Sequence, residues 1–193
     1  MANICNTEYV IKGDYKTIKG LWTTLVLLKV NQKNIWLGDF AKARKIDVES
    51  KKIPVRGEIY WAEYEEKDDY SILQMETESA WTACTEFFDE LNKSLGNSLS
   101  ISYREIECGC EIFYVHDEGN YFPGECCVSS SGGKFEDACE DVYYSTQDAI
   151  DNWCNIIGIE KGDRTEEDMV DFINNYEYDT EDTFYYIHPF EFD

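Results

Sequence analysis

"EIYWAEYEEKDDYSILQMETESAWTACTEFFDELNKSLGNSLSISYREIE", residues 58–107, decides the fold. Its first part is rich in aromatic and β-branched residues and is interrupted by the polar turn 67–69, which indicates a β-hairpin over 58–79. A helix is expected within residues 80–96, capped near Thr82 and closed by Gly96, because its apolar residues recur at helical spacing. The alternating pattern of 99–107 predicts a further strand.

The residues before this stretch add one strand and one helix. The strand covers Ile4–Lys12 and stops at Gly13, and Asp14 is placed to cap a helix that runs to about Asn31. The apolar face of this helix has helical spacing and consists of Ile18, Leu21, Trp22, Leu25 and Leu28. The resulting order is β-α-β-β-α-β, so the fold class is α+β, with a ferredoxin-like core and a mainly antiparallel sheet.

The remaining residues, 108–193, are expected to extend this core. A hairpin over 108–128 would lengthen the sheet, and helices are expected over about 145–157 and 165–175. The segment 183–192 predicts a final strand, which Pro189 confines to a sheet edge. The sequence is therefore interpreted as a single domain, 1–193, with the core in 1–107 and an acidic extension in 108–193.

The formal charge of −23 is concentrated in the C-terminal half. Residues 1–100 carry 13 Lys or Arg and 16 Asp or Glu, whereas residues 101–193 carry 4 and 24. So negative a surface disfavours direct binding of nucleic acid and suits a basic or nucleic-acid-binding protein as partner. The expected partner-binding residues are the acidic clusters and the tyrosines between them, namely Glu136, Asp137, Glu140, Asp141, Glu166, Glu167, Asp168, Tyr176, Tyr178, Asp179, Glu181 and Asp182.

Four of the eight cysteines lie between residues 106 and 128 and raise the possibility of a metal or redox site. Cys108 and Cys110 are too close for a zinc knuckle, and the neighbours Cys126 and Cys127 would point to opposite faces of a strand. If residues 117–120 form the turn of the hairpin, Cys110 faces Cys127 directly. A thiol pair of these two residues is the alternative reading of the site, and no metal site is expected.

A resemblance adds to this reading. The stretch "METESAWTACTEFFDELNKSLGNSLSISYREIECGCEIFYVHDEGN", residues 75–120, resembles the YubB-like ferredoxin-fold family of plasmid and phage proteins. The matching positions are Thr77, Trp81, Phe87, Phe88, Leu91, Tyr103, Arg104 and Glu105, with Asn3, Cys5 and Gly13 near the start. The chain departs from the family pattern at 82–84, where a proline is usual, and at 108–111, where glycines are usual. The resemblance covers about residues 1–130 and implies a fold and a mobile-element setting, but no catalytic residue.

Few catalytic or cofactor-binding motifs are compatible with this sequence. It has neither a phosphate-binding glycine loop nor a serine or cysteine nucleophile motif, and its two histidines are His116 and His188. No catalytic residue and no cofactor is therefore predicted. Residues 1–13 lack the features of a signal peptide and no apolar run is long enough to span a bilayer, so a cytoplasmic protein with reduced thiols and no membrane partner is expected.

These observations favour a non-enzymatic accessory protein of a mobile element that acts by protein–protein binding. A specific version is a DNA-mimicking inhibitor of a host nucleic-acid enzyme. The alternative is a metal or redox protein centred on the cysteine hairpin. RNA binding on the sheet ranks last, because the aromatic and basic signature of RNA-binding sheets is missing.

Overall fold

Strand β1 (Ile4–Gly13) lies between β4 and β5 in the larger of two sheets, and both pairings are antiparallel. In the computed structural model, which describes residues 3–193, the side chains of β1 alternate: Thr7, Tyr9 and Ile11 are buried against the helices. The described chain divides into two compact units. The first unit comprises residues 3–121 with Asp193, and the second unit comprises Phe122–Phe192.

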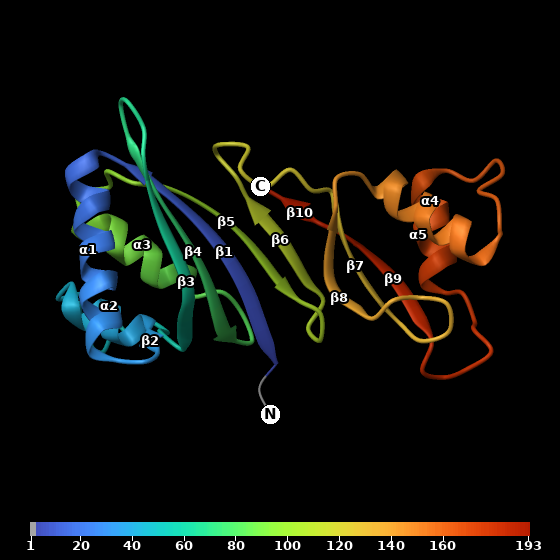
Figure 1. Ribbon diagram of the computed structural model, residues 1–193, viewed down its shortest axis with the longest axis horizontal. Coiled ribbons are helices and arrows are strands. Elements are labelled where there is room, and N and C mark those ends of the chain that lie inside the picture. The colour runs from blue at the N-terminus through green and yellow to red at the C-terminus, as the bar shows by residue number, and fades with distance from the viewer. Residues whose placement is uncertain (1–2) are drawn as a thin grey trace. The chain divides into compact units, whose positions relative to one another are not determined.

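The first unit contains three helices on one face of its sheet (Figure 1). Within this unit the strand order is β6-β5-β1-β4-β3-β2. After β1 the elements are α1 (Tyr15–Asn31), β2 (Ile35–Trp36), α2 (Leu37–Ala43), β3 (Gly57–Glu66), β4 (Ser71–Ala80), α3 (Thr85–Ser94), β5 (Ser100–Glu107) and β6 (Ile112–His116).

The helix boundaries in this unit have local causes. Asp14 caps α1 as predicted, because its carboxylate accepts a hydrogen bond from the Thr17 amide at 3.0 Å. The predicted cap at Thr82 is wrong, since α3 begins at Thr85 after Cys84 and has no side-chain cap. The Thr82 carbonyl instead accepts a bond from the Ser79 hydroxyl at 2.8 Å, which holds residue 82 in the turn that precedes the helix.

The second unit has its own sheet and its own core. Its sheet has the order β8-β7-β9, and α4 and α5 cover one face (Figure 1). Trp153 of α4 is fully buried there, together with Met169 of α5 and Ile187 of β9. The elements are β7 (Cys126–Ser131), β8 (Ala138–Tyr143), α4 (Thr146–Ile157), α5 (Glu166–Asn174), β9 (Phe184–Pro189) and β10 (Glu191–Phe192).

The predicted hairpin over 108–128 is wrong. Strand β6 pairs with β5, with Ile106 opposite Phe113, and β7 pairs with β8 and β9 in the other sheet. The buried carboxylate of Glu107 explains the change, because it accepts hydrogen bonds from the amides of Gly109 and Cys110 and so closes a tight turn directly after β5. The next strand therefore returns along β5.

The predictions for the C-terminal helices and the last strand are confirmed at the level of elements. Ser145 and Thr165 cap α4 and α5, and Asp168 completes a capping box with Thr165. Strand β9 is an edge strand of its sheet, as Pro189 indicated.

The described chain is thus a mixed α+β structure with five helices and two mostly antiparallel sheets. The interpretation as a single domain stays a prediction. Within residues 3–193, no helix combines the length and the apolar character needed to cross a membrane.

Candidate protein-binding surface of the second unit

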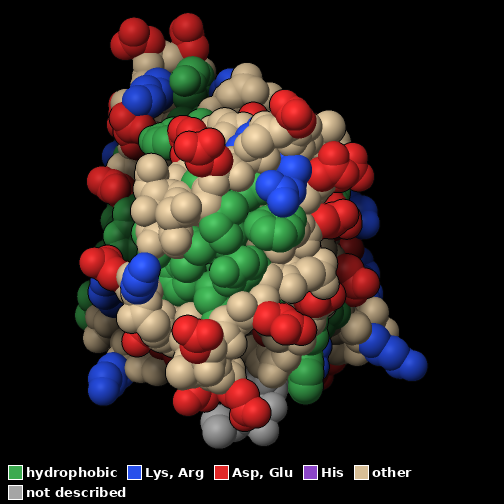
Figure 2. All heavy atoms as spheres, turned by 90° about the vertical axis from the view of Figure 1, so that its right-hand side faces the viewer, with side chains coloured by type: hydrophobic (Ala, Val, Ile, Leu, Met, Phe, Trp, Pro, Cys, Tyr) green, Lys and Arg blue, Asp and Glu red, His purple; other side chains and the backbone are tan. Residues whose placement is uncertain are grey.

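The carboxylates of the second unit point outward. Residues 122–192 carry 18 Asp or Glu, and all but Glu140 are exposed. Figure 2 shows such side chains around an apolar patch on the side of the molecule that carries α4 and α5. Apolar side chains that pack on the core but stay partly exposed include Ile157 of α4, Phe172 of α5 and Tyr176, which follows α5. An apolar centre with a charged rim is the arrangement found at protein–protein interfaces.

The cations of this unit are few, and two of the three have other partners. The Lys161 ammonium donates to the side-chain oxygen of Gln147 at 2.6 Å. The Arg164 guanidinium lies 4.3 Å from the centre of the Phe172 ring and donates to the Lys161 carbonyl at 3.2 Å. Lys134 is the third. Most carboxylates are therefore left to solvent, and the surface potential of this unit is negative.

A cavity of about 390 Å³ brings aromatic rings and carboxylates together on this surface. Tyr176, Tyr178 and Phe135 supply the rings, and Glu177 and Asp179 supply the charges. We call this cavity the aromatic groove. Lys134 also lines the groove, so its lining carries a net charge of −1. A cation that entered it would be favoured by the aromatic rings and by this net charge.

The rings of the aromatic groove are fixed by the core beneath them. The indole N–H of Trp153 donates to the Tyr178 hydroxyl at 2.8 Å, and the Tyr176 ring packs edge-on against Trp153 with a centroid distance of 5.2 Å. Phe135 meets Tyr178 at 5.5 Å and a right angle. Burial raises the pKa of Tyr178, so its hydroxyl stays neutral at physiological pH. The groove is thus preorganised and carries its negative charge on carboxylates alone.

A glycine turn places Phe135 in this groove. Gly132 and Gly133 both have positive φ, 73° and 61°. A Cβ on Gly132 would lie 2.8 Å from the backbone oxygen of Asp182, so a side chain is excluded there on steric as well as conformational grounds. The turn brings residues 134 and 135 next to the segment 176–183.

A second cavity, of about 470 Å³, shares Lys134 and Phe135 with the aromatic groove. It is also lined by Glu136 and Asp141, two of the predicted partner-binding residues. Tyr185 lies at its base, where its hydroxyl donates to the Ala149 carbonyl at 3.1 Å and burial raises its pKa. Carboxylates and aromatic rings therefore line two cavities that share Lys134 and Phe135.

The structure brings only some of the predicted partner-binding residues together. Tyr176, Tyr178 and Asp179 line the aromatic groove, and Glu136 and Asp141 line the adjoining cavity. The others lie outside both linings: Asp137 accepts a bond from Ser131, Glu140 is on β8, Glu166, Glu167 and Asp168 form the first turn of α5, and Glu181 and Asp182 precede β9.

Sequence reasoning missed Phe135, Glu177 and Ile157 as groove residues. Glu177 could have been found, because it stands between the two predicted tyrosines. Phe135 reaches them from a loop more than 40 positions earlier, and only the two glycines before it hint at a tight turn.

The cysteines do not form the predicted arrangement. With β6 and β7 in different sheets, the register that placed Cys110 opposite Cys127 does not exist, and Cys127 pairs with Val142 and His188 instead. Among residues 3–193, no two cysteines form a disulfide. Hydrogen bonding to Glu107 raises the pKa of the Cys110 thiol, which keeps it in its less nucleophilic form.

Two further observations concern possible catalytic or metal chemistry. The Ser129 hydroxyl and the His188 Nε2 atom lie 2.9 Å apart across β7 and β9, so His188 ties the edge strand to the centre of its sheet. Among residues 3–193, no three His, Cys, Asp or Glu side chains converge in a way that could hold a metal ion.

No family model, curated protein or solved structure matches the chain. The resemblance of residues 75–120 to the YubB-like family therefore stays a prediction.

Proposed function

We propose that the chain is a non-catalytic binding protein whose second unit holds a basic partner protein. The observation that carries this proposal is the aromatic groove, where Tyr176, Tyr178 and Phe135 meet Glu177 and Asp179 on a unit with 18 acidic and 3 basic residues. The exposed carboxylates attract the partner, and the groove receives one of its Arg or Lys side chains.

The two features supply different parts of the binding free energy. Exposed carboxylates contribute little individually, about 0–1 kcal/mol per ion pair, but together they accelerate association and make it dependent on salt. A guanidinium stacked on a tyrosine ring contributes about 0.5–2 kcal/mol and is less sensitive to salt. We therefore expect the groove to select an arginine-rich site from among the basic proteins that the charge attracts.

A narrower form of the proposal is a DNA-mimicking inhibitor of a host nucleic-acid enzyme, carried by a mobile element. Its support is the exposed negative charge, which would compete with phosphates for a basic groove, and the resemblance to plasmid and phage proteins. We also propose a ferredoxin-like topology for the first unit. The element order β1-α1-β3-β4-α3-β5, with the sheet order β5-β1-β4-β3, supports it.

The face of the first unit's sheet that lies away from its helices argues against a nucleic acid as partner. Glu8 lies directly opposite Glu76 across β1 and β4, and Glu58 lies opposite Glu78 across β3 and β4. Arg104 is bound to Glu8 there. This sheet face therefore offers phosphates little net attraction.

The proposal is tested with fluorescent peptides and fluorescence anisotropy at 50 and 300 mM NaCl. The probes are an arginine-rich peptide, a lysine-rich peptide of equal charge and a glutamate-rich control. We expect the arginine-rich peptide to bind most tightly and the glutamate-rich peptide not to bind. The double substitution Glu177→Gln/Asp179→Asn should weaken arginine binding on the order of fivefold.

The matched control is Glu160→Gln/Asp163→Asn, which removes the same charge outside the groove lining and should weaken binding about twofold or less. Equal losses in the two double variants would overturn the role of the groove. No binding of either basic peptide at 50 mM NaCl would overturn the function itself. Duplex DNA added to a complex with a DNA-binding enzyme should displace the chain if the DNA-mimicking form is correct.

A further inference from the structure

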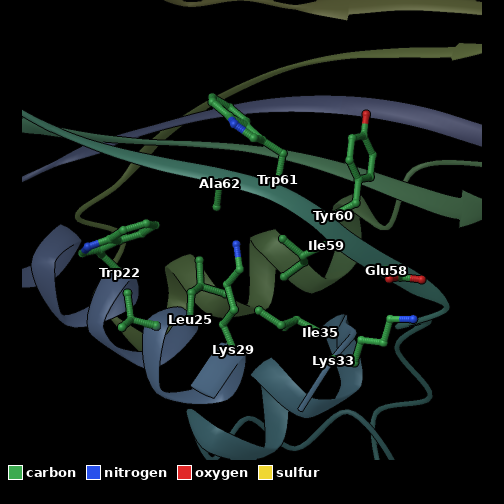
Figure 3. A pocket seen from close by; sticks show the side chains of 11 residues that line it. Trp22, Leu25, Lys29, Lys33, Ile35, Glu58, Ile59, Tyr60, Trp61 and Ala62 are labelled. Atoms are coloured by element: carbon green, nitrogen blue, oxygen red, sulfur yellow. The ribbon is translucent and has the colours of Figure 1, made fainter. Parts of the chain in front are cut away.

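A second kind of site lies in the first unit, at the outer edge of its sheet. A cavity of about 140 Å³ opens between α1, β2 and β3, and we call it the edge cavity (Figure 3). Its apolar surface comes from Leu25, Ile35 and Ile59, which are all buried, and from Ala62. Trp22 forms one wall and is held by stacking on Tyr64, with a centroid distance of 6.4 Å and an interplanar angle of 19°.

The edge cavity exists because β2 is short. Strand β2 pairs with β3 only at Ile35 opposite Ile59 and Trp36 opposite Glu58. Beyond Ile59, no strand within the described residues covers the outer edge of β3, and a bulge between Ile59 and Trp61 shifts the register against β4. Within the described chain, the cavity therefore has no covering strand on this side, although the apolar side chains at its base are themselves buried.

Exposed apolar side chains are unusually frequent around this opening. The first unit has nine large apolar residues with substantial exposure, and six of them lie on β2, β3 and the second half of α1, the segments that border the edge cavity. These six are Val26, Leu27 and Val30 of α1, Trp36 of β2, and Tyr60 and Trp61 of β3. Clustered exposed apolar groups mark binding sites more often than scattered ones do.

The charges in the lining add up to one positive charge. Lys29 and Lys33 are opposed by Glu58. In Figure 3, Lys29 rises from α1 toward β3 between Leu25 and Ile59. Among residues 3–193 its ammonium group has no hydrogen-bond or ion-pair partner, whereas Lys51 and Lys67 are paired with Glu90 and Glu65. Lys29 is exposed and belongs to the lining, so it places an unpaired cation beside the apolar residues of the cavity.

We propose that the edge cavity binds a small monocarboxylate with a ring-sized apolar group. The apolar group enters the cavity, and the carboxylate pairs with Lys29. The size fits, because a protein cavity of about 150 Å³ holds one benzene molecule. The net charge of the lining matches a single negative charge. This site is independent of the proposed basic-protein surface, since it lies in the other unit and has the opposite charge preference.

Ligands with several negative charges fit less well. Glu58 is part of the lining, and Glu63, Glu65 and Glu66 follow on the same strand. A nucleic-acid strand or a strongly acidic peptide that continued along β3 would meet these carboxylates. The carboxylate could belong to a free metabolite or to the C-terminal residue of a peptide, and the test separates these two sources.

The test uses phenylacetate with the ¹⁵N-labelled full chain, with binding followed by NMR shifts of backbone amides and by calorimetry. We expect a Kd on the order of 1 mM, with the largest shifts in residues 22–35 and 58–62. The neutral isostere phenylacetamide should bind about threefold to fivefold more weakly. Lys29→Met should weaken the binding of phenylacetate by the same factor and leave the binding of phenylacetamide unchanged.

Two variants control for structure and for general charge. Lys16→Met removes an exposed charge elsewhere on α1 and should leave binding unchanged. Ala62→Leu fills the cavity and should abolish binding while the thermal midpoint of unfolding stays near that of the original chain. A short peptide ending in phenylalanine that binds at least tenfold more tightly than phenylacetate, and loses this gain on C-terminal amidation, identifies a peptide terminus as the source. A peptide that binds no better identifies a free metabolite.

Three outcomes would overturn the proposal. The first is the absence of NMR shifts in backbone amides near the edge cavity at 10 mM phenylacetate, which would show that the cavity is only a gap in the packing. The second is equal binding of phenylacetate and phenylacetamide. The third is a Lys29→Met variant that binds both probes as the original chain does.

Discussion

The two units of the chain are built alike and charged differently. Each has helices on one face of a mostly antiparallel sheet and a core of its own. The first unit carries 14 basic and 22 acidic residues, and its segment 12–56 has 11 basic against 4 acidic ones. The second unit carries 3 and 18. Both units have a packed apolar core, so the difference in charge is not required by the fold.

The candidate sites follow this division. In the second unit, aromatic rings lie beside carboxylates, and in the first unit a lysine lies over an apolar cavity. The first arrangement suits a cation and the second a monoanion. A single chain could therefore hold two ligands of opposite charge without competition between them.

The largest expected effect tests whether the two cores are separate. Trp153→Ala removes the largest fully buried side chain of the second unit and the hydrogen bond that fixes Tyr178. We expect it to lower the free energy of unfolding of this unit by about 3–5 kcal/mol. Hydrogen exchange followed by mass spectrometry should show faster exchange in peptides from 122–192, with 3–121 unchanged.

Trp153→Phe is the matched control for this experiment, because it keeps an aromatic ring and loses only part of the volume and the N–H group. Exchange should again be faster in 122–192 alone, with a smaller loss in the free energy of unfolding. If peptides from 3–121 also exchanged faster in Trp153→Ala, the units would unfold as one cooperative domain, as the sequence predicted.

The parts of the fold that could be predicted from the sequence are those with strong local signals. Asp14 and Thr165 marked helix starts, and the apolar stripe Phe87, Phe88 and Leu91 marked α3. Strand β8 was not predicted, because the adjacent charged residues Glu140 and Asp141 interrupt the alternation of apolar and polar residues that marks a strand. The false hairpin arose because strand pairing is not a local property. The turn that the buried Glu107 carboxylate closes decides which strand β6 pairs with. In the sequence, nothing distinguishes Glu107 from the other acidic residues.

The candidate sites were predictable to a smaller degree. Tyr176, Tyr178 and Asp179 could be singled out because they adjoin one another in the sequence. Their contact with Phe135, and the approach of Lys29 to β3, depend on tertiary structure. Charge composition predicted a basic partner for the C-terminal half, which stays a prediction, but it did not indicate where a cavity would form.

Alkaline pH should destabilise both units through one buried thiol in each. Burial raises the pKa of Cys126 to about 11 and that of Cys5 to about 12. Above pH 9 the unfolded chain releases these protons while the folded chain retains them, so the free energy of unfolding falls as pH rises. We expect each thiol to contribute a loss on the order of 1 kcal/mol between pH 8 and pH 10.

Urea unfolding at pH 8, 9 and 10 measures this loss. Cys5→Ala and Cys126→Ala should each lower the stability at pH 8, because a small cavity is created, and should each reduce the further loss toward pH 10. The two effects should add, since the thiols lie in different cores. A loss between pH 8 and pH 10 that neither substitution reduces would exclude these thiols as its cause.

The smallest expected effect concerns the charge difference itself. Self-repulsion among the carboxylates destabilises the second unit at low ionic strength, and added salt screens it. Raising NaCl from 20 to 300 mM should therefore slow hydrogen exchange more in α4 and α5 than in α1 and α3, by the equivalent of a few tenths of a kcal/mol. Glu181→Gln/Asp182→Asn should reduce the salt effect in the second unit alone. Equal slowing in both units would mean that salt acts on them generally, and the separation of charge would then matter for binding but not for stability.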